Sequence, residues 1–132
     1  MAEGLILETT FLIDLERETA AGIDGPAHEF LTAHSAEPVF ITFTIVGELA
    51  AGLAPEGRDE WERLIAPFPV LPPTNDVAWR YGTLHQYLRT NGMLIGANDL
   101  WIAATALAFD RALVTRNARE YRRVPGLKVV GY

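Results

Sequence analysis

Short apolar runs recur along the chain and are separated by longer segments with helical spacing of apolar residues. Three of these runs lie at residues 5–7, 39–41 and 112–114, and a last strand is expected at residues 127–130, where Lys128 interrupts the apolar residues. Continuous apolar runs of this length are typical of strands buried on both faces of a parallel sheet. A further stretch, residues 67–73, contains four prolines. Because proline cannot donate a hydrogen bond within a sheet, this stretch is expected to be an edge strand or an extended connection.

The segments between the strands carry apolar residues three or four positions apart, as amphipathic helices do. In the first of them, Phe11, Leu12 and Leu15 form the apolar stripe. Its solvent side is expected to hold Asp14, Glu16, Arg17 and Glu18. Later helices are expected at residues 26–31, 44–54, 56–65, 74–91 and 98–107. Side chains suited to N-caps stand at Thr9 or Thr10, Thr42 or Thr44, and Asn98 or Asp99.

Strands that alternate with helices predict an α/β domain with a parallel sheet and helices on both faces. At 132 residues the chain is long enough for one hydrophobic core, so residues 1–132 are expected to form a single domain. No apolar run approaches 18 residues and the N-terminus carries no export signal, which predicts a soluble, cytoplasmic protein without a membrane partner.

Composition narrows the chemistry. The absence of cysteine excludes disulfides, thiolate metal sites and cysteine nucleophiles. The net charge of -6 is unevenly distributed, since residues 1–62 carry 13 acidic and 2 basic residues and residues 63–132 carry 4 acidic and 9 basic ones. Arginines near the C-terminus are suited to phosphate contacts or simply form a solvated helix face, and both interpretations remain open. This basic cluster comprises Arg111, Arg116, Arg119, Arg122, Arg123 and Lys128.

Three acidic residues stand out because few charges surround them. Glu8 directly follows the first strand, Glu48 is the only charge between Pro38 and Pro55, and Asp99 is the only one between Arg89 and Asp110. A half-buried carboxylate needs a cation, a metal ion or hydrogen-bond donors, although each residue alone could be an ordinary cap or surface acid. In parallel sheets, sites form at the carboxyl ends of the strands, where Glu8 and, after a later strand, Asn117 are expected.

Acidic side chains that meet at one end of a sheet repel one another, and their pKa values rise unless a cation is bound. Carboxylate and amide oxygens are the ligands that Mg²⁺ and Mn²⁺ prefer, and such a site suits the hydrolysis of phosphodiesters. The chain has no nucleophile elbow around its single serine, no phosphate-binding loop and no metal-ligand spacing among its three histidines. The residues therefore favour metal-assisted phosphoryl chemistry.

Four motifs resemble those of PIN domains, specifically the VapC toxins of bacterial toxin–antitoxin pairs. They lie in the family's order and spacing at residues 7–14, 41–49, 95–104 and 113–127. The resemblance implies a three-layer α/β/α fold with a central parallel sheet of order 3-2-1-4-5. It also implies a Mg²⁺- or Mn²⁺-dependent endoribonuclease acting on structured RNA of the tRNA or rRNA class, a homodimer, and inhibition by a VapB-type antitoxin.

The resemblance also assigns roles to residues. Glu8, Glu48 and Asp99 fall on the first three acidic positions and would be catalytic residues and metal ligands, while Asn117 falls on the fourth catalytic position. The possible auxiliary residues are Thr115 and Glu120, and the candidates for RNA contact are Arg116, Arg119 and Arg122. The first position is ordinarily aspartate, so Glu8 leaves two alternatives: an active ribonuclease, or a catalytically weakened domain that mainly dimerises and binds antitoxin or RNA.

Overall fold

A five-stranded parallel sheet forms the centre of the computed structural model, which describes residues 4–132. Its strands lie in the order β3-β2-β1-β4-β5 and every neighbouring pair is parallel. Their bounds are β1 Leu5–Leu7, β2 Val39–Thr42, β3 Val70–Leu71, β4 Ala112–Val114 and β5 Val129–Val130. The predicted parallel sheet and its strand order are confirmed, and the proline-flanked strand β3 lies at an edge as expected.

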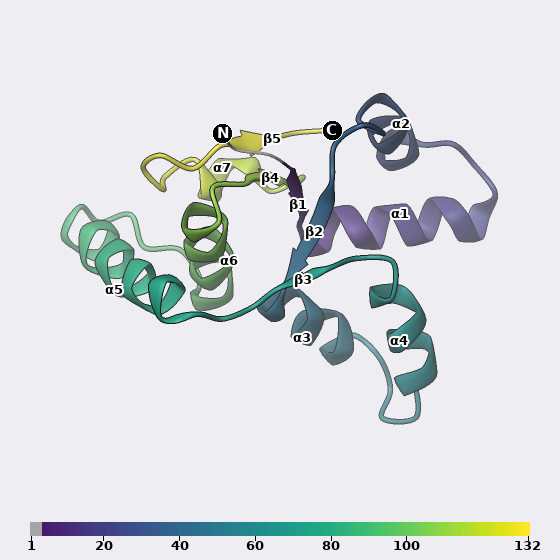
Figure 1. Cartoon of the computed structure of the whole chain (residues 1–132), viewed down its shortest axis with the longest axis horizontal. Helices are drawn as coiled ribbons and strands as arrows, with labels where there is room; N and C mark the ends of the chain where they lie inside the picture. The colour runs from purple at the N-terminus through teal and green to yellow at the C-terminus, as the bar shows by residue number, and fades with distance from the viewer. Residues whose placement is uncertain (1–3) are drawn as a thin grey trace.

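Helices cover both faces of this sheet. They are α1 Thr9–Ala21, α2 Pro26–Ala33, α3 Phe43–Ala51, α4 Arg58–Ile65, α5 Asn75–Thr90, α6 Ala97–Ala108 and α7 Ala118–Tyr121. In Figure 1, α5 and α6 lie to one side of the strands and α1, α2 and α4 to the other. The arrangement is the three-layer α/β/α fold that the motifs predicted.

The central strands set the position of the site. β1 pairs with β4 in the register Leu7↔Val114, and the backbone N–H of Glu8 donates to the carbonyl oxygen of Val114 at 3.0 Å. All three residues of β1 are buried, as expected for a strand covered on both faces. Because β1 and β4 are parallel neighbours, the residues that follow them, Glu8 and Thr115, meet at the same edge of the sheet.

Two of the expected helix caps are wrong, while one is confirmed. Thr42 caps α3 by accepting from the backbone N–H of Ile45, as predicted. Helix α1 is capped by Glu8 instead of a threonine, because its side chain folds back to accept from the N–H of Thr10. Helix α6 begins after Gly96 without a side-chain cap, so Asn98 and Asp99 belong to its first turn.

Glu18 is buried, although the helical pattern placed it on the solvent side of α1. Its side chain, in a residue only 6% exposed, accepts hydrogen bonds from the backbone N–H groups of Ala27 and His28 at the start of α2. It also contacts the His28 ring at 2.8 Å. A β-carbon at Gly25 would lie 2.6 Å from the Glu18 side chain, so a larger residue here would displace the Glu18 carboxylate from these contacts. The expectation failed because α2 folds back over α1.

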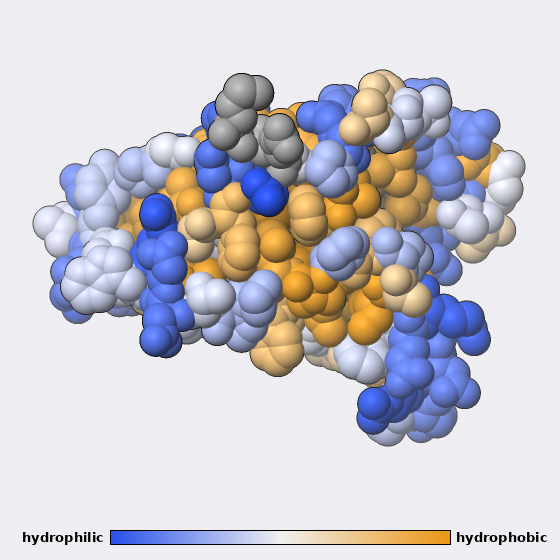
Figure 2. Space-filling model, viewed as in Figure 1, coloured by the Kyte–Doolittle hydropathy of each residue, from blue (hydrophilic) through white to orange (hydrophobic). Residues whose placement is uncertain are grey.

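The surface is mixed in character. In Figure 2 the middle of the molecule is mostly hydrophobic on the face shown, whereas the arm formed by α4 is mostly hydrophilic.

Within residues 4–132, none of the helices combines the length and the apolar character needed to cross a membrane.

Candidate active site

Glu8 lies at the junction of β1 and α1 and is only 4% exposed. Its Oε1 accepts hydrogen bonds from the hydroxyls of Thr115 at 2.7 Å and Thr10 at 3.2 Å. Its Oε2 accepts from the backbone N–H of Thr10 at 3.0 Å. Both oxygens therefore have donors, which is what the burial of a carboxylate requires.

The same two threonines hold the loop that follows β4. The hydroxyl of Thr115 accepts from the N–H of Asn117 at 2.9 Å, and that of Thr10 accepts from the N–H of Arg116 at 3.2 Å. Because both threonines also donate to Glu8, the buried carboxylate, the start of α1 and the loop form one hydrogen-bonded unit. Thr115, an expected auxiliary residue, thus contacts Glu8 directly.

Glu48 lies on α3 and is partly buried. Its Oε1 accepts from the hydroxyl of Thr9 at 2.7 Å, and its Oε2 lies 3.5 Å from the side-chain nitrogen of Asn98 in the first turn of α6. Glu48 has no charged neighbours in the sequence, and in the fold its polar partners come from two other helices, α1 and α6.

Asp99 lies in the first turn of α6, and its Oδ1 accepts a hydrogen bond from the hydroxyl of Tyr121 on α7 at 2.9 Å. Burial raises the pKa of the Asp99 carboxyl above its ordinary value, while the Tyr121 hydrogen bond acts in the opposite direction. The charges of Glu8, Glu120 and Glu48 raise the pKa of Asp99 further. The carboxylates thus act on one another electrostatically, as the clustering of acids predicted.

The donor chemistry suits a hard divalent cation, since Glu8, Glu48 and Asp99 offer only oxygen and carry net negative charge. The three side chains, however, do not lie close enough together to bind one metal ion jointly. Within residues 4–132, no three acidic or histidine side chains gather closely enough to hold a metal ion. The physical reason at Glu8 is its role as a helix cap, which commits both carboxylate oxygens to other donors.

The remaining predicted residues surround the acids. Asn117 is exposed at the N-cap position of α7, and Glu120 on the same helix lies close enough for its charge to raise the pKa of Asp99. Arg116 is exposed but paired, because its guanidinium donates to both oxygens of Asp14 at 2.9 and 3.0 Å. Arg119 and Arg122 are exposed on α7 and at its end.

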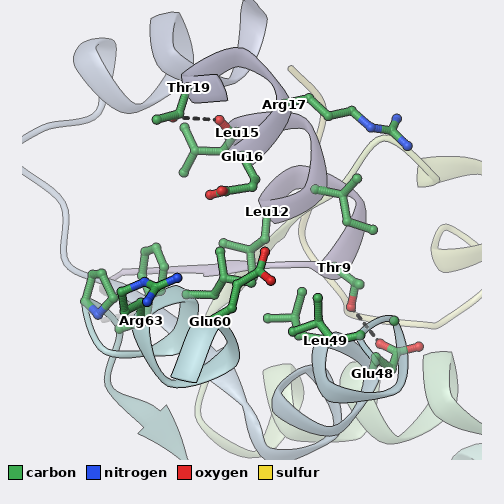
Figure 3. A pocket seen from close by; sticks show the side chains of 16 residues that line it. Thr9, Leu12, Leu15, Glu16, Arg17, Thr19, Glu48, Leu49, Glu60 and Arg63 are labelled. Atoms are coloured by element: carbon green, nitrogen blue, oxygen red, sulfur yellow. Dashed lines mark hydrogen bonds between the residues drawn. The ribbon is translucent and has the colours of Figure 1, made fainter. Parts of the chain in front are cut away.

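A groove of about 450 Å³ opens beside the acids, between α1, α3 and α4. Its apolar lining includes Leu12, Ile13, Leu15, Leu49, Leu53, Leu64 and Phe68. Figure 3 shows the hydrogen bond between Thr9 and Glu48 on one side of the groove and Arg63 of α4 on the opposite side, with Glu60 between them. The groove is therefore continuous with the acidic site through the Thr9–Glu48 pair.

Sequence reasoning missed three side chains that organise the site. Thr9 and Thr10 were expected only as caps, yet their hydroxyls contact Glu48 and Glu8. Tyr121 gave no signal beyond being an aromatic residue four positions after Asn117. Only the folded arrangement of α7 against α6 reveals its contact with Asp99.

Comparison with known proteins agrees with this architecture. The PIN domain family model matches residues 5–127. The solved structure of DNA-bound VapBC from Salmonella typhimurium superimposes with a TM-score of 0.82 at 25% identity, covering 99% of this chain and 98% of that one.

Two curated relatives are ribonucleases by name. Ribonuclease VapC1 of Haemophilus influenzae is 39% identical over 59 residues. The match covers 45% of this chain and 44% of that protein, less than half of each. Ribonuclease VapC10 of Mycobacterium tuberculosis is 34% identical over 107 residues, 81% of this chain and 80% of that protein. Both of these relatives are named as VapC ribonucleases. The chain therefore belongs to the PIN domain family.

Proposed function

We propose that this protein is a cytoplasmic, metal-dependent endoribonuclease toxin that cleaves structured RNA of the tRNA or rRNA class. One observation carries the proposal. Acids from three separate elements, Glu8, Glu48 and Asp99, lie at one end of the sheet close enough for the first two to raise the pKa of the third. A fold that places like charges together at the carboxyl ends of its strands favours a cation and a phosphodiester substrate there.

Glu48 and Asp99 would hold Mg²⁺ or Mn²⁺, with Glu8 as a third ligand once its cap contacts rearrange. When bound, such an ion polarises a phosphodiester and makes hydroxide available near neutral pH. Thr9 orients Glu48 through its 2.7 Å hydrogen bond, and Thr115 holds the loop that carries Asn117. Arg116, Arg119 and Arg122 are exposed beside these residues, where guanidinium groups suit the RNA backbone.

A VapB-type antitoxin is the proposed partner, and the chain itself is proposed to form a homodimer. The related Salmonella typhimurium structure is a VapBC complex bound to DNA. The apolar groove between α1, α3 and α4 supports this partner because it could hold the apolar face of a helix and leads directly to Glu48. An Arg or Lys beyond that helix would enter the acidic site and replace the metal as counter-charge.

Incubation of the purified protein with total RNA, in Mn²⁺ or in EDTA, tests the activity. New 5′ ends that appear only with Mn²⁺ are the expected result, and their positions identify the RNA target. Asp99→Asn is the matched control, because asparagine keeps the shape and the Tyr121 contact but removes the charge. Cleavage that persists in EDTA or in Asp99→Asn would refute the metal-dependent assignment.

A catalytically weakened domain that mainly dimerises and binds antitoxin or RNA is the second candidate function. The hydrogen bonding of Glu8 favours it, since a carboxylate that caps α1 with both oxygens is less available as a ligand. Aspartate at position 8 would keep the charge, could still cap α1, and would withdraw the carboxylate by one methylene.

We therefore expect Glu8→Asp to raise RNA turnover in Mg²⁺, by roughly tenfold or more, since a misplacement near 1 Å can cost about a hundredfold. The measurement is single-turnover cleavage of one defined RNA by both proteins. Turnover that is equal or lower in Glu8→Asp would show that glutamate is a competent residue at this position and remove the case for a weakened enzyme.

A further inference from the structure

Tyr121 is a fully buried tyrosine whose hydroxyl points at an acidic residue of the site. It is 0% exposed and belongs to the four-residue helix α7. Its backbone carbonyl accepts from the N–H of Val124 at 3.1 Å, which fixes the turn after the helix. The side chain crosses to α6, where its hydroxyl donates to Oδ1 of Asp99 at 2.9 Å.

A buried phenol needs a hydrogen-bond partner, and a backbone carbonyl would satisfy that need as well as a carboxylate does. Here the partner is the isolated acid of α6. The contact fixes one oxygen of Asp99, while Oδ2 accepts no hydrogen bond from any residue within 4–132. One oxygen of Asp99 is therefore held by the protein and the other remains available to a ligand.

The hydroxyl is a permanent donor. A tyrosine hydroxyl ordinarily ionises only at about pH 10, so it is neutral at physiological pH and acts as the donor to Asp99. It therefore adds no further negative charge to the acidic cluster. A neutral donor in this place restrains the Asp99 carboxylate and leaves its negative charge uncompensated. A salt bridge to Arg or Lys would instead offset that charge.

We propose that Tyr121 is a positioning residue for Asp99: its hydroxyl holds Oδ1 so that Oδ2 is presented in one orientation to a divalent cation at the acidic site. The inference rests on the proposed function. Hydrogen bonds of this kind commonly orient carboxylates that bind metals, and their loss typically costs roughly ten- to a hundredfold in metal affinity or activity.

Tyr121→Phe tests the assignment because it removes one oxygen atom and keeps the buried ring. We expect Mn²⁺ affinity, measured by titration calorimetry, to fall by roughly tenfold or more. At saturating Mn²⁺, kcat for RNA cleavage should fall while KM for RNA stays unchanged. Tyr132→Phe is the matched control, since Tyr132 also donates to a carboxylate, that of Asp14, and its loss should leave Mn²⁺ affinity unchanged.

A folded Tyr121→Phe protein that binds Mn²⁺ as tightly as the parent would overturn the inference, even if the parent cleaves RNA normally. The reverse result, weaker Mn²⁺ binding in a protein whose parent never cleaves RNA, would support the inference and refute the proposed ribonuclease. If the parent does not bind Mn²⁺, the inference and the metal-dependent function both fail.

A second measurement covers the case in which Tyr121→Phe does not fold. The hydroxyl proton of Tyr121 in the parent should be protected from solvent and visible by NMR, because the residue is fully buried. Addition of Mg²⁺ should shift its resonance in the parent and leave it unmoved in Asp99→Asn. A resonance that does not respond to Mg²⁺ in the parent would overturn the inference.

Discussion

Asp99 is an acid whose ionised form the fold disfavours. Burial raises its pKa, and the charges of Glu8, Glu120 and Glu48 raise it further. A carboxyl group whose pKa is higher in the folded protein than in the unfolded chain binds its proton more tightly when folded. Its contribution to stability is therefore greatest below its ordinary pKa and is lost as the pH rises through the raised value.

From this linkage we expect Asp99→Asn to be more stable than the parent at neutral pH in EDTA, with a melting temperature a few degrees higher. The advantage should shrink as the pH falls toward the ordinary pKa of aspartate, because the parent then becomes neutral at this position too. Mn²⁺ should raise the melting temperature of the parent and leave that of Asp99→Asn unchanged.

Thermal unfolding with and without Mn²⁺, at several pH values, measures both effects. Asp76→Asn is a suitable control, because Asp76 is exposed on α5 and pairs with Arg80 one turn away, far from the acidic residues of the site in the sequence. An Asp99→Asn protein that is less stable than the parent in EDTA at neutral pH would contradict the view that the acidic cluster is strained without a cation.

The junction of α1 and α2 shows how one side chain can join two elements. Burial by itself would raise the pKa of Glu18, but the N–H groups of His28 and Ala27 and the His28 ring together hold the pKa below its ordinary value. A carboxyl group with a lowered folded-state pKa stabilises the protein above the pKa of the unfolded chain. That stabilisation is lost as the pH falls through the folded value.

Glu18→Gln should therefore lower the melting temperature by several degrees at neutral pH, since its amide nitrogen would face N–H donors at the start of α2. The difference from the parent should narrow as the pH falls below about 4.5, the ordinary value for this group. Glu16→Gln, at an exposed position of the same helix, should change little. A pH-independent difference for Glu18→Gln would exclude the carboxylate as the stabilising group.

The strands and one helix cap could be predicted from the sequence, whereas contacts that depend on how the helices pack could not. Buried strands gave continuous apolar runs, and Thr42 caps α3 as predicted. Glu8 as the cap of α1 could not be predicted, because a long side chain must fold back on its own helix. The burial of Glu18 likewise depends on a second helix packing over it.

The site could be predicted only in part. Glu48 and Asp99 stood out because no other charges surround them in the sequence, and this isolation reflects the close packing of α3 and α6 around the sheet end. Their hydroxyl partners, Thr9 and Tyr121, come from other elements and are common residue types. Such contacts between distant segments leave no local pattern in a single sequence.

At the scale of the whole molecule, the apolar groove and the acidic site form one continuous surface, joined by Thr9 and Glu48. We expect Ile13→Asp to weaken binding of the cognate antitoxin by roughly tenfold or more, because it places a charge in the apolar groove. Mn²⁺ binding should be unaffected, since the substitution leaves Glu48 and Asp99 in place.

Ile23→Asp is the matched control for this experiment. Ile23 is 56% exposed between α1 and α2, outside the groove, while Ile13 is 38% exposed within it. Antitoxin affinity can be compared by calorimetry for the two variants and the parent. Equal affinity for Ile13→Asp and Ile23→Asp would place the antitoxin elsewhere on the molecule.

The two edges of the sheet restrict how copies of this chain can assemble. Both edge strands, β3 and β5, are only two residues long, and Pro69 and Pro72 directly flank β3. Long, exposed edges invite strand addition by other chains, whereas short edges and prolines discourage it. A continuous intermolecular sheet is therefore disfavoured, and we expect the proposed homodimer to use surfaces other than the sheet edges. The same short, proline-flanked edges make the folded chain a poor template for strand addition by another copy.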